Sequence, residues 1–203
     1  MSGRWIYVCG PSGAGKDSVI AFARDALRQR TDLVFTRRLI TRPAHPGSDH
    51  EPVDDRRFDA LLAGGGLAMH WSAHGVRYGV PAHHSDQVAS GCLVVVNGSR
   101  AHLASLAPDE QRRVVLVTTD AQCLQARIEA RGRDSPADLA SRLARNACAT
   151  EPAADCILHN AGSLAQTGAQ WVAWLEAECL RVRPLAPGDS AGSAAPTAGR
   201  GTR

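Results

Sequence analysis

The stretch Gly10-Pro11-Ser12-Gly13-Ala14-Gly15-Lys16-Asp17-Ser18, "GPSGAGKDS", is the most informative part of the sequence about the fold. Its spacing is that of a phosphate-binding loop, a glycine-rich turn between a strand and a helix that points backbone N–H groups at one spot. The apolar run Trp5–Cys9 before it predicts a buried strand, and Asp17–Arg30 after it has the apolar spacing of a helix. Because the helix N-terminus adds positive potential, these nine residues predict a site for a nucleoside triphosphate.

Two residues of the loop carry its chemistry. Lys16, the only lysine in the chain, would reach the β- and γ-phosphates. Asp17 replaces the Ser or Thr hydroxyl that ordinarily faces Mg²⁺. Two interpretations of Asp17 stay open: an acid favoured by the helix dipole, or a ligand of Mg²⁺, directly or through water. The strand 93–97 favours the metal, because it ends in Asn97 where such folds often end in a metal-associated Asp.

Length and composition narrow the class of protein. The 203 residues suit one domain, with 44% apolar residues, 21% charged residues and a net charge of +3. The mild charge, with no interleaved basic and aromatic residues, predicts no nucleic-acid partner. No leader and no apolar run near the length of a membrane span are seen, and the six cysteines form no C-x-x-C pair. We expect a reduced, soluble, cytoplasmic protein without a membrane partner.

The rest of the chain alternates buried runs with helical patterns, which predicts an α/β fold, a parallel sheet flanked by helices. Further strands are expected at Cys92–Val96, Val114–Thr118 and Cys156–Leu158, and helices at Ala121–Arg131, Pro136–Ala147 and Leu164–Arg181. Residues of about 37–80 are rich in Pro, Gly, His and charge and predict an inserted lobe, with a short helix from Asp54 through Leu62. We expect a single domain over 1–183 and a disordered tail over 184–203.

Beyond the loop, several blocks resemble the guanylate kinase superfamily of P-loop kinases over roughly residues 5–180. They are Thr41-Arg42-Pro43 with Gly47, the block His74–Gly79, Arg131-Gly132-Arg133 before a helix with Arg142 and Arg145, and Asp155–Asn160. The resemblance implies that the lobe binds the acceptor and that residues of about 128–146 form a lid.

The same resemblance implies roles for individual residues. The catalytic set is Lys16, Arg131 and Arg142, and Arg133 and Asn160 join the loop in binding ATP. The acceptor-binding set is Arg38, Arg42, Tyr78, Asn97, Arg100 and Arg145. Arg100 joins it because it follows the carboxyl end of a predicted strand, where ligands of α/β sheets collect. For the lid arginines a solvated helix face stays open as an alternative, and for Arg100 a surface position.

Departures from guanylate kinases concern the base of the acceptor. An ungapped alignment of residues 38–97 puts Met69 at the guanine-reading acid and Val80 at the guanine-reading hydroxyl. Neither side chain can make those hydrogen bonds, whereas the phosphate-side positions keep cations or donors as Arg38, His45 and His50. The residues expected to bind the acceptor phosphate are therefore retained, whereas those that would bind a base are absent.

A base-free phosphorylated sugar suits such a pocket, and the chain more closely resembles the ribose 1,5-bisphosphate phosphokinases of phosphonate catabolism. The shared blocks are Gly10–Ser18, Ile40–Arg42, Tyr78–Val80, Val96–Leu103 and Arg131–Asp134. The resemblance implies phosphoryl transfer from ATP to ribose 1,5-bisphosphate, giving 5-phosphoribosyl 1-diphosphate, with Mg²⁺ as cofactor. A carboxylate in the loop would repel so anionic a pair of substrates unless it held a cation, so Asp17 is the expected metal ligand.

Two other functions stay open at this point. A nucleoside monophosphate kinase of altered base choice would need new polar groups facing the base. A non-catalytic binding module would not need Lys16 or an arginine-bearing lid. The expected partners are ATP and ribose 1,5-bisphosphate, and a homodimer is an arrangement that the sequence leaves open.

Overall fold

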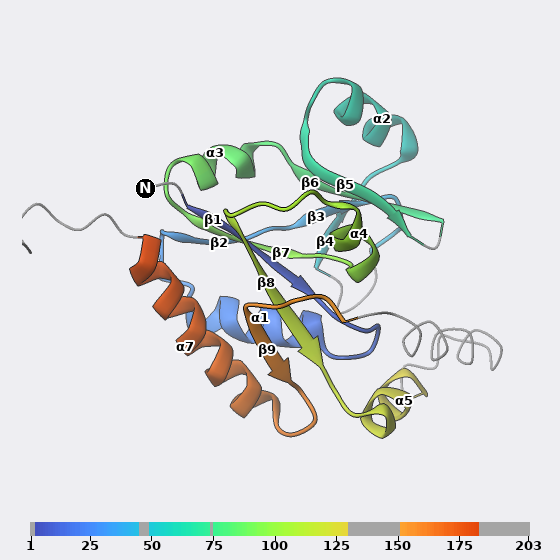
Figure 1. The fold of residues 1–203 in the computed structure, drawn as a ribbon. Helices are drawn as coiled ribbons and strands as arrows, with labels where there is room; N and C mark the ends of the chain where they lie inside the picture. The colour runs from blue at the N-terminus through green and yellow to red at the C-terminus, as the bar shows by residue number, and fades with distance from the viewer. Residues whose placement is uncertain (1–2, 45–48, 74, 130–150, 183–203) are drawn as a thin grey trace, which may run out of the picture.

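The computed structural model describes residues 3–44, 49–73, 75–129 and 151–182 (Figure 1). Its elements are β1 (Arg4–Cys9), α1 (Lys16–Ala26), β2 (Leu33–Phe35), β3 (Arg38–Ile40), β4 (His50–Pro52), α2 (Asp55–Ala63), β5 (Leu67–Ala73), β6 (Val76–Pro81), α3 (His83–Ala89), β7 (Leu93–Asn97), α4 (Arg100–Ser105), β8 (Arg112–Thr118), α5 (Ala121–Glu129), β9 (Cys156–His159) and α7 (Leu164–Val182). Residues 130–146 of the expected lid, with Arg131, Arg133, Arg142 and Arg145, and the tail 184–203 lie outside the described residues.

A parallel five-stranded sheet forms the centre, in the order β2-β7-β1-β8-β9. The α/β fold with a parallel sheet flanked by helices, predicted from the sequence, is confirmed. Successive side chains of β1 point to opposite faces, because a strand has a period of two. Ile6 and Val8 face one core, while Trp5, Tyr7 and Cys9 face another.

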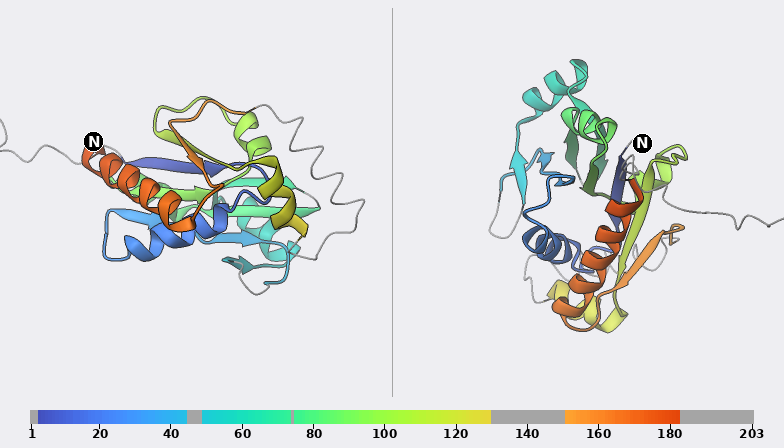
Figure 2. Two further views of the ribbon diagram at one scale, coloured as in Figure 1. Left: turned by 90° about the horizontal axis from the view of Figure 1, so that it is seen from below. Right: turned by 90° about the vertical axis from the view of Figure 1, so that its left-hand side faces the viewer.

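The first core lies between the sheet and the helices α1 and α7, which pack side by side (Figure 2). α1 contributes Val19, Ile20 and Ala23, and α7 contributes the fully buried Trp171 and Leu175. Burying each large apolar side chain stabilises the fold by about 1.5–3 kcal/mol.

Helix α1 ends at Ala26, four residues earlier than the expected end at Arg30. There the chain turns, because the Arg30 N–H donates to the Leu27 carbonyl at 2.9 Å. The Arg30 guanidinium also binds the Asp32 carboxylate, with Nε 2.8 Å from Oδ1. These local bonds favour a turn over another helical turn and direct the chain into β2.

The inserted part forms a second sheet, in the order β4-β3-β6-β5. One face packs on α2 through Leu39, Val53 and Phe58, and α2 lies on the outer side of this sheet (Figure 1). The expected short helix is confirmed, and Asp54 caps it by accepting from the Arg57 N–H at 2.7 Å. The other face packs on the five-stranded sheet through Trp71 and Val80. No helix among the described residues is both long and apolar enough to cross a membrane.

Candidate active site

The glycine-rich loop follows β1 at the carboxyl edge of the five-stranded sheet, where ligands of α/β sheets collect. Gly10, Gly13 and Gly15 all have positive φ, and Gly10 and Gly15 also lie close against other parts of the chain. Gly10 has φ 147°, and a Cβ there would lie 2.1 Å from the Val117 carbonyl oxygen. Gly15 has φ 89°, and a Cβ there would lie 2.3 Å from the Asn160 side-chain nitrogen. The loop can therefore lie close against β8 and the residue that follows β9.

Asn160 supports the loop from within the protein. Its side-chain amide donates to the Ala14 carbonyl at 2.8 Å, and the residue is 3% exposed. Arg127 of α5 donates to the same carbonyl at 3.4 Å. The resemblance placed Asn160 beside ATP, and the structure places its amide on the loop backbone. No pattern in the sequence indicates the Arg127 contact.

Lys16, the first residue of α1, turns its ammonium back onto the loop. Nζ donates to the carbonyls of Gly10 and Pro11, at 2.9 Å each. Burial lowers the pKa of Lys16 to about 8, against an opposing effect of the Asp17 carboxylate. A bound polyphosphate would supply stronger acceptors than the two carbonyls and would favour the charged ammonium.

Asp17 joins three segments that are far apart in the sequence. The Asn97 amide, at the end of β7, donates to Asp17 Oδ1 at 2.6 Å. The Arg38 guanidinium, at the start of β3, lies 4.0 Å from the same oxygen. The side chain is 63% exposed, and the N-cap of α1 is Gly15, which has no side-chain cap. Asp17 thus lies in the first turn, where the dipole favours an acid, with its side chain directed at Asn97 and Arg38.

Arg38 and Tyr78 lie together beside Asp17. The Arg38 guanidinium carbon is 5.7 Å from the centre of the Tyr78 ring, within range of a cation–π contact. Arg38 is only 16% exposed, and burial lowers its pKa. A cation kept in so little water attracts an anion strongly.

Arg42 and Arg100 lie close enough to this group to repel its positive charges. The charge of Arg42 lowers the pKa of Arg38, and the charge of Arg100 lowers the pKa of Lys16. His50, an expected phosphate-side residue, is 2% exposed, and its Nε2 bonds the Arg42 carbonyl at 3.1 Å. His50 therefore supports the backbone of Arg42. The four lid arginines lie outside the described residues.

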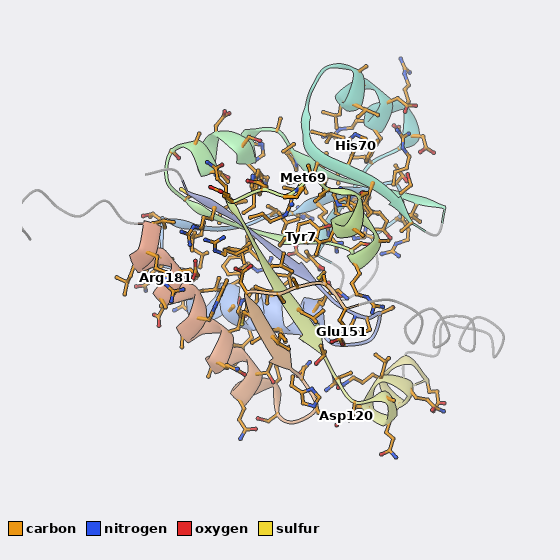
Figure 3. All side chains as sticks on the ribbon, viewed as in Figure 1. Tyr7, Met69, His70, Asp120, Glu151 and Arg181 are labelled. Atoms are coloured by element: carbon orange, nitrogen blue, oxygen red, sulfur yellow. The ribbon has the colours of Figure 1, made fainter. Side chains whose placement is uncertain are left out.

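Met69 and Val80 are direct partners across the β5–β6 pair. Val80 is completely buried, and Met69 packs on the same cluster where the two sheets meet (Figure 3). The two positions that depart from the guanine-reading pattern thus form one apolar rung. It adjoins the rung of Trp71 and Tyr78 on the same face of the sheet.

Sequence reasoning missed an aromatic stack beside the site. The Trp71 ring stacks on Tyr78, with centres 5.3 Å apart, and on His102, with centres 4.6 Å apart. The Tyr7 hydroxyl lies 2.7 Å from His102 Nδ1. His102 belongs to the Val96–Leu103 block, and Trp71 follows Met69 by two residues, which is the strand period. Nothing in the sequence showed that these rings meet.

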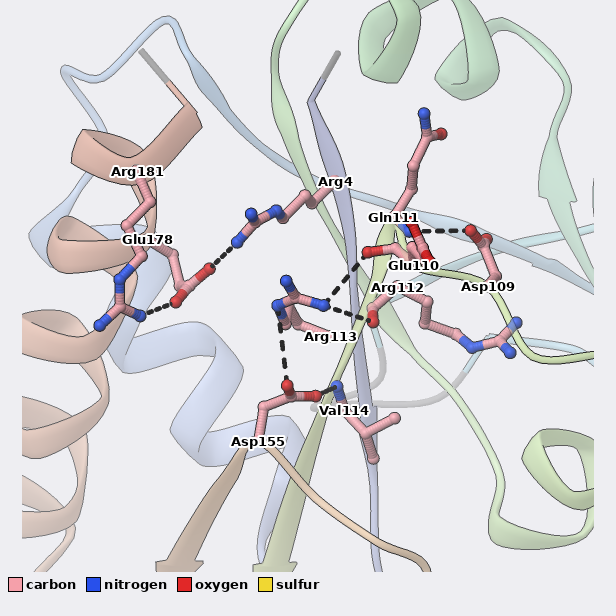
Figure 4. A network of polar contacts seen from close by, with 10 residues as sticks. All are labelled: Arg4, Asp109, Glu110, Gln111, Arg112, Arg113, Val114, Asp155, Glu178 and Arg181. Carbon is pink, nitrogen blue, oxygen red and sulfur yellow. Dashed lines mark hydrogen bonds and ion pairs between the residues drawn. The ribbon is translucent and has the colours of Figure 1, made fainter. Parts of the chain in front are cut away.

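Another polar cluster lies at the opposite, amino-terminal edge of the sheet (Figure 4). Arg4 NH1 lies 2.7 Å from Glu178 Oε2, and Arg181 pairs with Oε1 of the same carboxylate. Arg113 Nε lies 3.6 Å from Asp155, which accepts from the Val114 N–H at 2.8 Å. A cavity of about 420 Å³ lies among these side chains. Because the charges are paired with one another, the cluster joins α7 to the sheet.

A glycine-rich loop with a lysine ammonium turned onto it, beside a mostly buried arginine of an inserted sheet, is the arrangement of a P-loop kinase. A guanylate kinase from Anaplasma phagocytophilum has this fold: the TM-score is 0.63 at 18% identity, covering 88% of this chain and 87% of that one. No family model matches the chain. No group of three or more His, Cys, Asp or Glu side chains gathers as a metal cluster within the described ranges.

Curated relatives are far more similar in sequence. A ribose 1,5-bisphosphate phosphokinase PhnN from Pseudofrankia inefficax is 44% identical over 169 residues, which cover 83% of this chain and 88% of the relative. The protein of that name from Acidiphilium cryptum is 43% identical over 188 residues, covering 91% and 96%. The chain belongs to the family of ribose 1,5-bisphosphate phosphokinases.

Proposed function

We propose that the protein transfers the γ-phosphoryl group of ATP to the 1-phosphate of ribose 1,5-bisphosphate, in phosphonate degradation. An oxygen of the 1-phosphate attacks Pγ, the bond from Pγ to the bridging oxygen breaks, and 5-phosphoribosyl 1-diphosphate and ADP result. The observation that carries the proposal is the apolar Met69–Val80 rung beside Arg38 and Tyr78. Arg38 offers the acceptor site a positive charge for a phosphate, whereas Met69 and Val80 offer no hydrogen-bonding group for a base.

The donor side rests on the loop. Gly10 to Ser18 would surround the phosphates of ATP, with Lys16 exchanging its two carbonyl contacts for phosphate oxygens. Asn160 and Arg127 hold the Ala14 carbonyl and so keep the loop in shape before ATP arrives. Preorganised positive groups of this kind stabilise charge that develops in the transition state without having to reorganise.

The acceptor side rests on the second sheet and the end of β7. Arg38, Arg42 and Tyr78 would hold the 5-phosphate, while Asn97 and Arg100 would bind the 1-phosphate that attacks. In the lid, Arg131 and Arg142 would act on the migrating phosphoryl group, Arg133 on ATP and Arg145 on the acceptor. Arginine suits these positions, because its planar guanidinium binds phosphate oxygens in pairs.

Mg²⁺ fits the residues around Asp17. This ion usually keeps several waters and takes one or two carboxylates with the phosphates of the substrates. Asp17 supplies an exposed carboxylate in the loop, and Asn97 fixes its direction through the 2.6 Å hydrogen bond. When bound, the ion neutralises the negative charge of the two substrates. Asp17 also balances Arg38 in the absence of substrates.

Replacing Asp17 by asparagine keeps the size of the side chain and removes its charge. We expect the Mg²⁺ concentration for half-maximal activity to rise roughly 10- to 100-fold. Titrations of Mg²⁺ at saturating ATP measure the shift. Asp25→Asn, at an exposed acid of the same helix, is the matched control and should leave the titration unchanged. An Asp17→Asn enzyme with wild-type Mg²⁺ dependence would contradict the metal role.

The reaction is tested by measuring ADP with ribose 1,5-bisphosphate and with GMP as acceptors, and by quantifying 5-phosphoribosyl 1-diphosphate directly. Turnover with the sugar bisphosphate alone supports the proposal. Turnover with GMP alone would show that a nucleoside monophosphate kinase is the correct function. ATP binding without turnover of either acceptor would favour the non-catalytic module.

We place the reaction in the cytoplasm, where ATP is available and thiols stay reduced. In agreement, the five cysteines in the described part of the chain, Cys9, Cys92, Cys123, Cys156 and Cys179, are free. The homodimer stays a prediction.

A further inference from the structure

Three rings lie almost parallel between the second sheet and α4. Trp71 is the middle ring, tilted by 4° from Tyr78 and by 15° from His102. Centre distances of 5.3 and 4.6 Å are those of offset stacking. Only 9% of Trp71 is exposed, so its indole fills the space between the two neighbours.

Both outer rings are also held by contacts other than the stack. Tyr78 is anchored by the β3–β6–β5 pairing of its strand. His102 is held by the Tyr7 hydroxyl, which also accepts from the Ser99 N–H at 3.1 Å. Tyr7 can reach this position because Gly98 has no side chain: a Cβ there would lie 2.1 Å from the Tyr7 ring. The space between Tyr78 and His102 is therefore built by other parts of the protein.

The size of that space is the size of a nucleobase. Indole is a fused five- and six-membered ring system, as is a purine, and a base stacks on aromatic faces whatever its sequence identity. The space is also next to the residues proposed to bind phosphate, because Tyr78 is an outer ring of the stack and contacts Arg38. A nucleotide whose phosphate was held by Arg38 and Tyr78 would have its base directed at this part of the lobe.

We propose that Trp71 determines the specificity of the acceptor site by occupying, between Tyr78 and His102, the flat slot that a purine base would otherwise take. The indole is a built-in substitute for the base, so an acceptor nucleotide is excluded by volume and a base-free phosphorylated sugar is admitted. This inference rests on the proposed function, since it concerns the choice of acceptor at that same site. It adds a steric cause to the missing hydrogen bonds at Met69 and Val80.

The test is Trp71→Ala, assayed beside the wild type with ribose 1,5-bisphosphate and with GMP. We expect kcat/KM for GMP to rise roughly 10- to 100-fold above the wild-type value, the range that base stacking supplies. Free indole should raise the melting temperature of Trp71→Ala and leave that of the wild type unchanged. Trp71→Phe, which keeps a ring in the slot, should gain little activity with GMP.

Trp174→Ala is the matched control, because Trp174 is a partly buried tryptophan of α7 outside this stack. It should gain no activity with GMP. If Trp71→Ala does not fold, Trp71→Leu, which stays apolar but has no flat face, takes its place in every assay.

The outcomes separate the inference from the function. A wild type that makes 5-phosphoribosyl 1-diphosphate, with a folded Trp71→Ala that responds neither to GMP nor to indole, overturns the inference alone. If the wild type and Trp71→Ala use GMP equally well, both the inference and the proposed function are overturned. A wild type that uses neither acceptor overturns the proposed function, and binding of indole by Trp71→Ala then still supports the slot.

Discussion

Replacing Lys16 by methionine should lower kcat/KM roughly 10³-fold, the loss typical of removing a charge that stabilises a transition state. Methionine keeps the unbranched, apolar stem and removes only the ammonium. In the protein without substrates that ammonium contacts two backbone carbonyls of its own loop. Burial lowers its pKa to about 8 and so disfavours its charge, which gains most when phosphate oxygens replace the carbonyls. Removing it therefore harms the transition state more than the fold.

Steady-state kinetics with both substrates varied, together with thermal melting, measure the two effects separately. The melting temperature should change little, and it can even rise, because a buried charge is removed. Lys16→Arg tests whether charge alone suffices. A broad guanidinium cannot take the place of a compact ammonium between Gly10 and Pro11, so this variant should stay strongly impaired. A Lys16→Met enzyme within threefold of wild-type activity would refute the role of Lys16.

Replacing Glu178 by alanine should instead lower stability by about 3 kcal/mol, the low end for breaking a buried ion pair, and leave catalysis unchanged. The Glu178 side chain is 2% exposed and accepts from Arg4 and Arg181 (Figure 4). Arg4 is 23% exposed, so it would lose its partner while partly hydrated, which places the cost at the low end. The cluster lies at the amino-terminal edge of the sheet, away from the loop.

Thermal unfolding measures this prediction, with a fall in melting temperature of roughly 6–12 °C for a chain of this size. Arg181→Ala removes the partner that is 61% exposed and should cost at most about 1 kcal/mol. The double variant Arg4→Met with Glu178→Met should recover most of the loss, because apolar side chains of similar volume replace a buried pair at little cost. Equal losses in Arg181→Ala and Glu178→Ala would contradict this account.

The strands of the central sheet could be predicted because buried parallel strands appear as continuous apolar runs between helices. Each of the predicted strands Trp5–Cys9, Cys92–Val96, Val114–Thr118 and Cys156–Leu158 lies within two residues of an observed one. The phosphate loop could be predicted because its glycines serve the backbone, as the geometry of Gly10 and Gly15 shows. Both signals are local in the sequence.

The contacts across the site could not be predicted, because they join residues that only the tertiary fold brings together. Asp17 and Asn97 are 80 residues apart in the sequence, and Asn160 and Ala14 are 146 apart. Two strands of the second sheet, β3 and β4, were also hidden, since they have only three residues each, too few to show a period. Polar residues such as Arg38 and His50 take their environment from this sheet.

The single lysine has a practical consequence for work on this enzyme. An amine-reactive reagent attacks the neutral amine, and a side chain with a pKa of about 8 supplies that form near neutral pH. Apart from the α-amino group, Lys16 is the one primary amine in the chain. A label that reacts with amines, read at the peptide that carries Lys16 so that the α-amino group is not counted, therefore reports on the phosphate loop. Protection of that peptide from labelling by ATP measures occupancy of the donor site without any engineered residue.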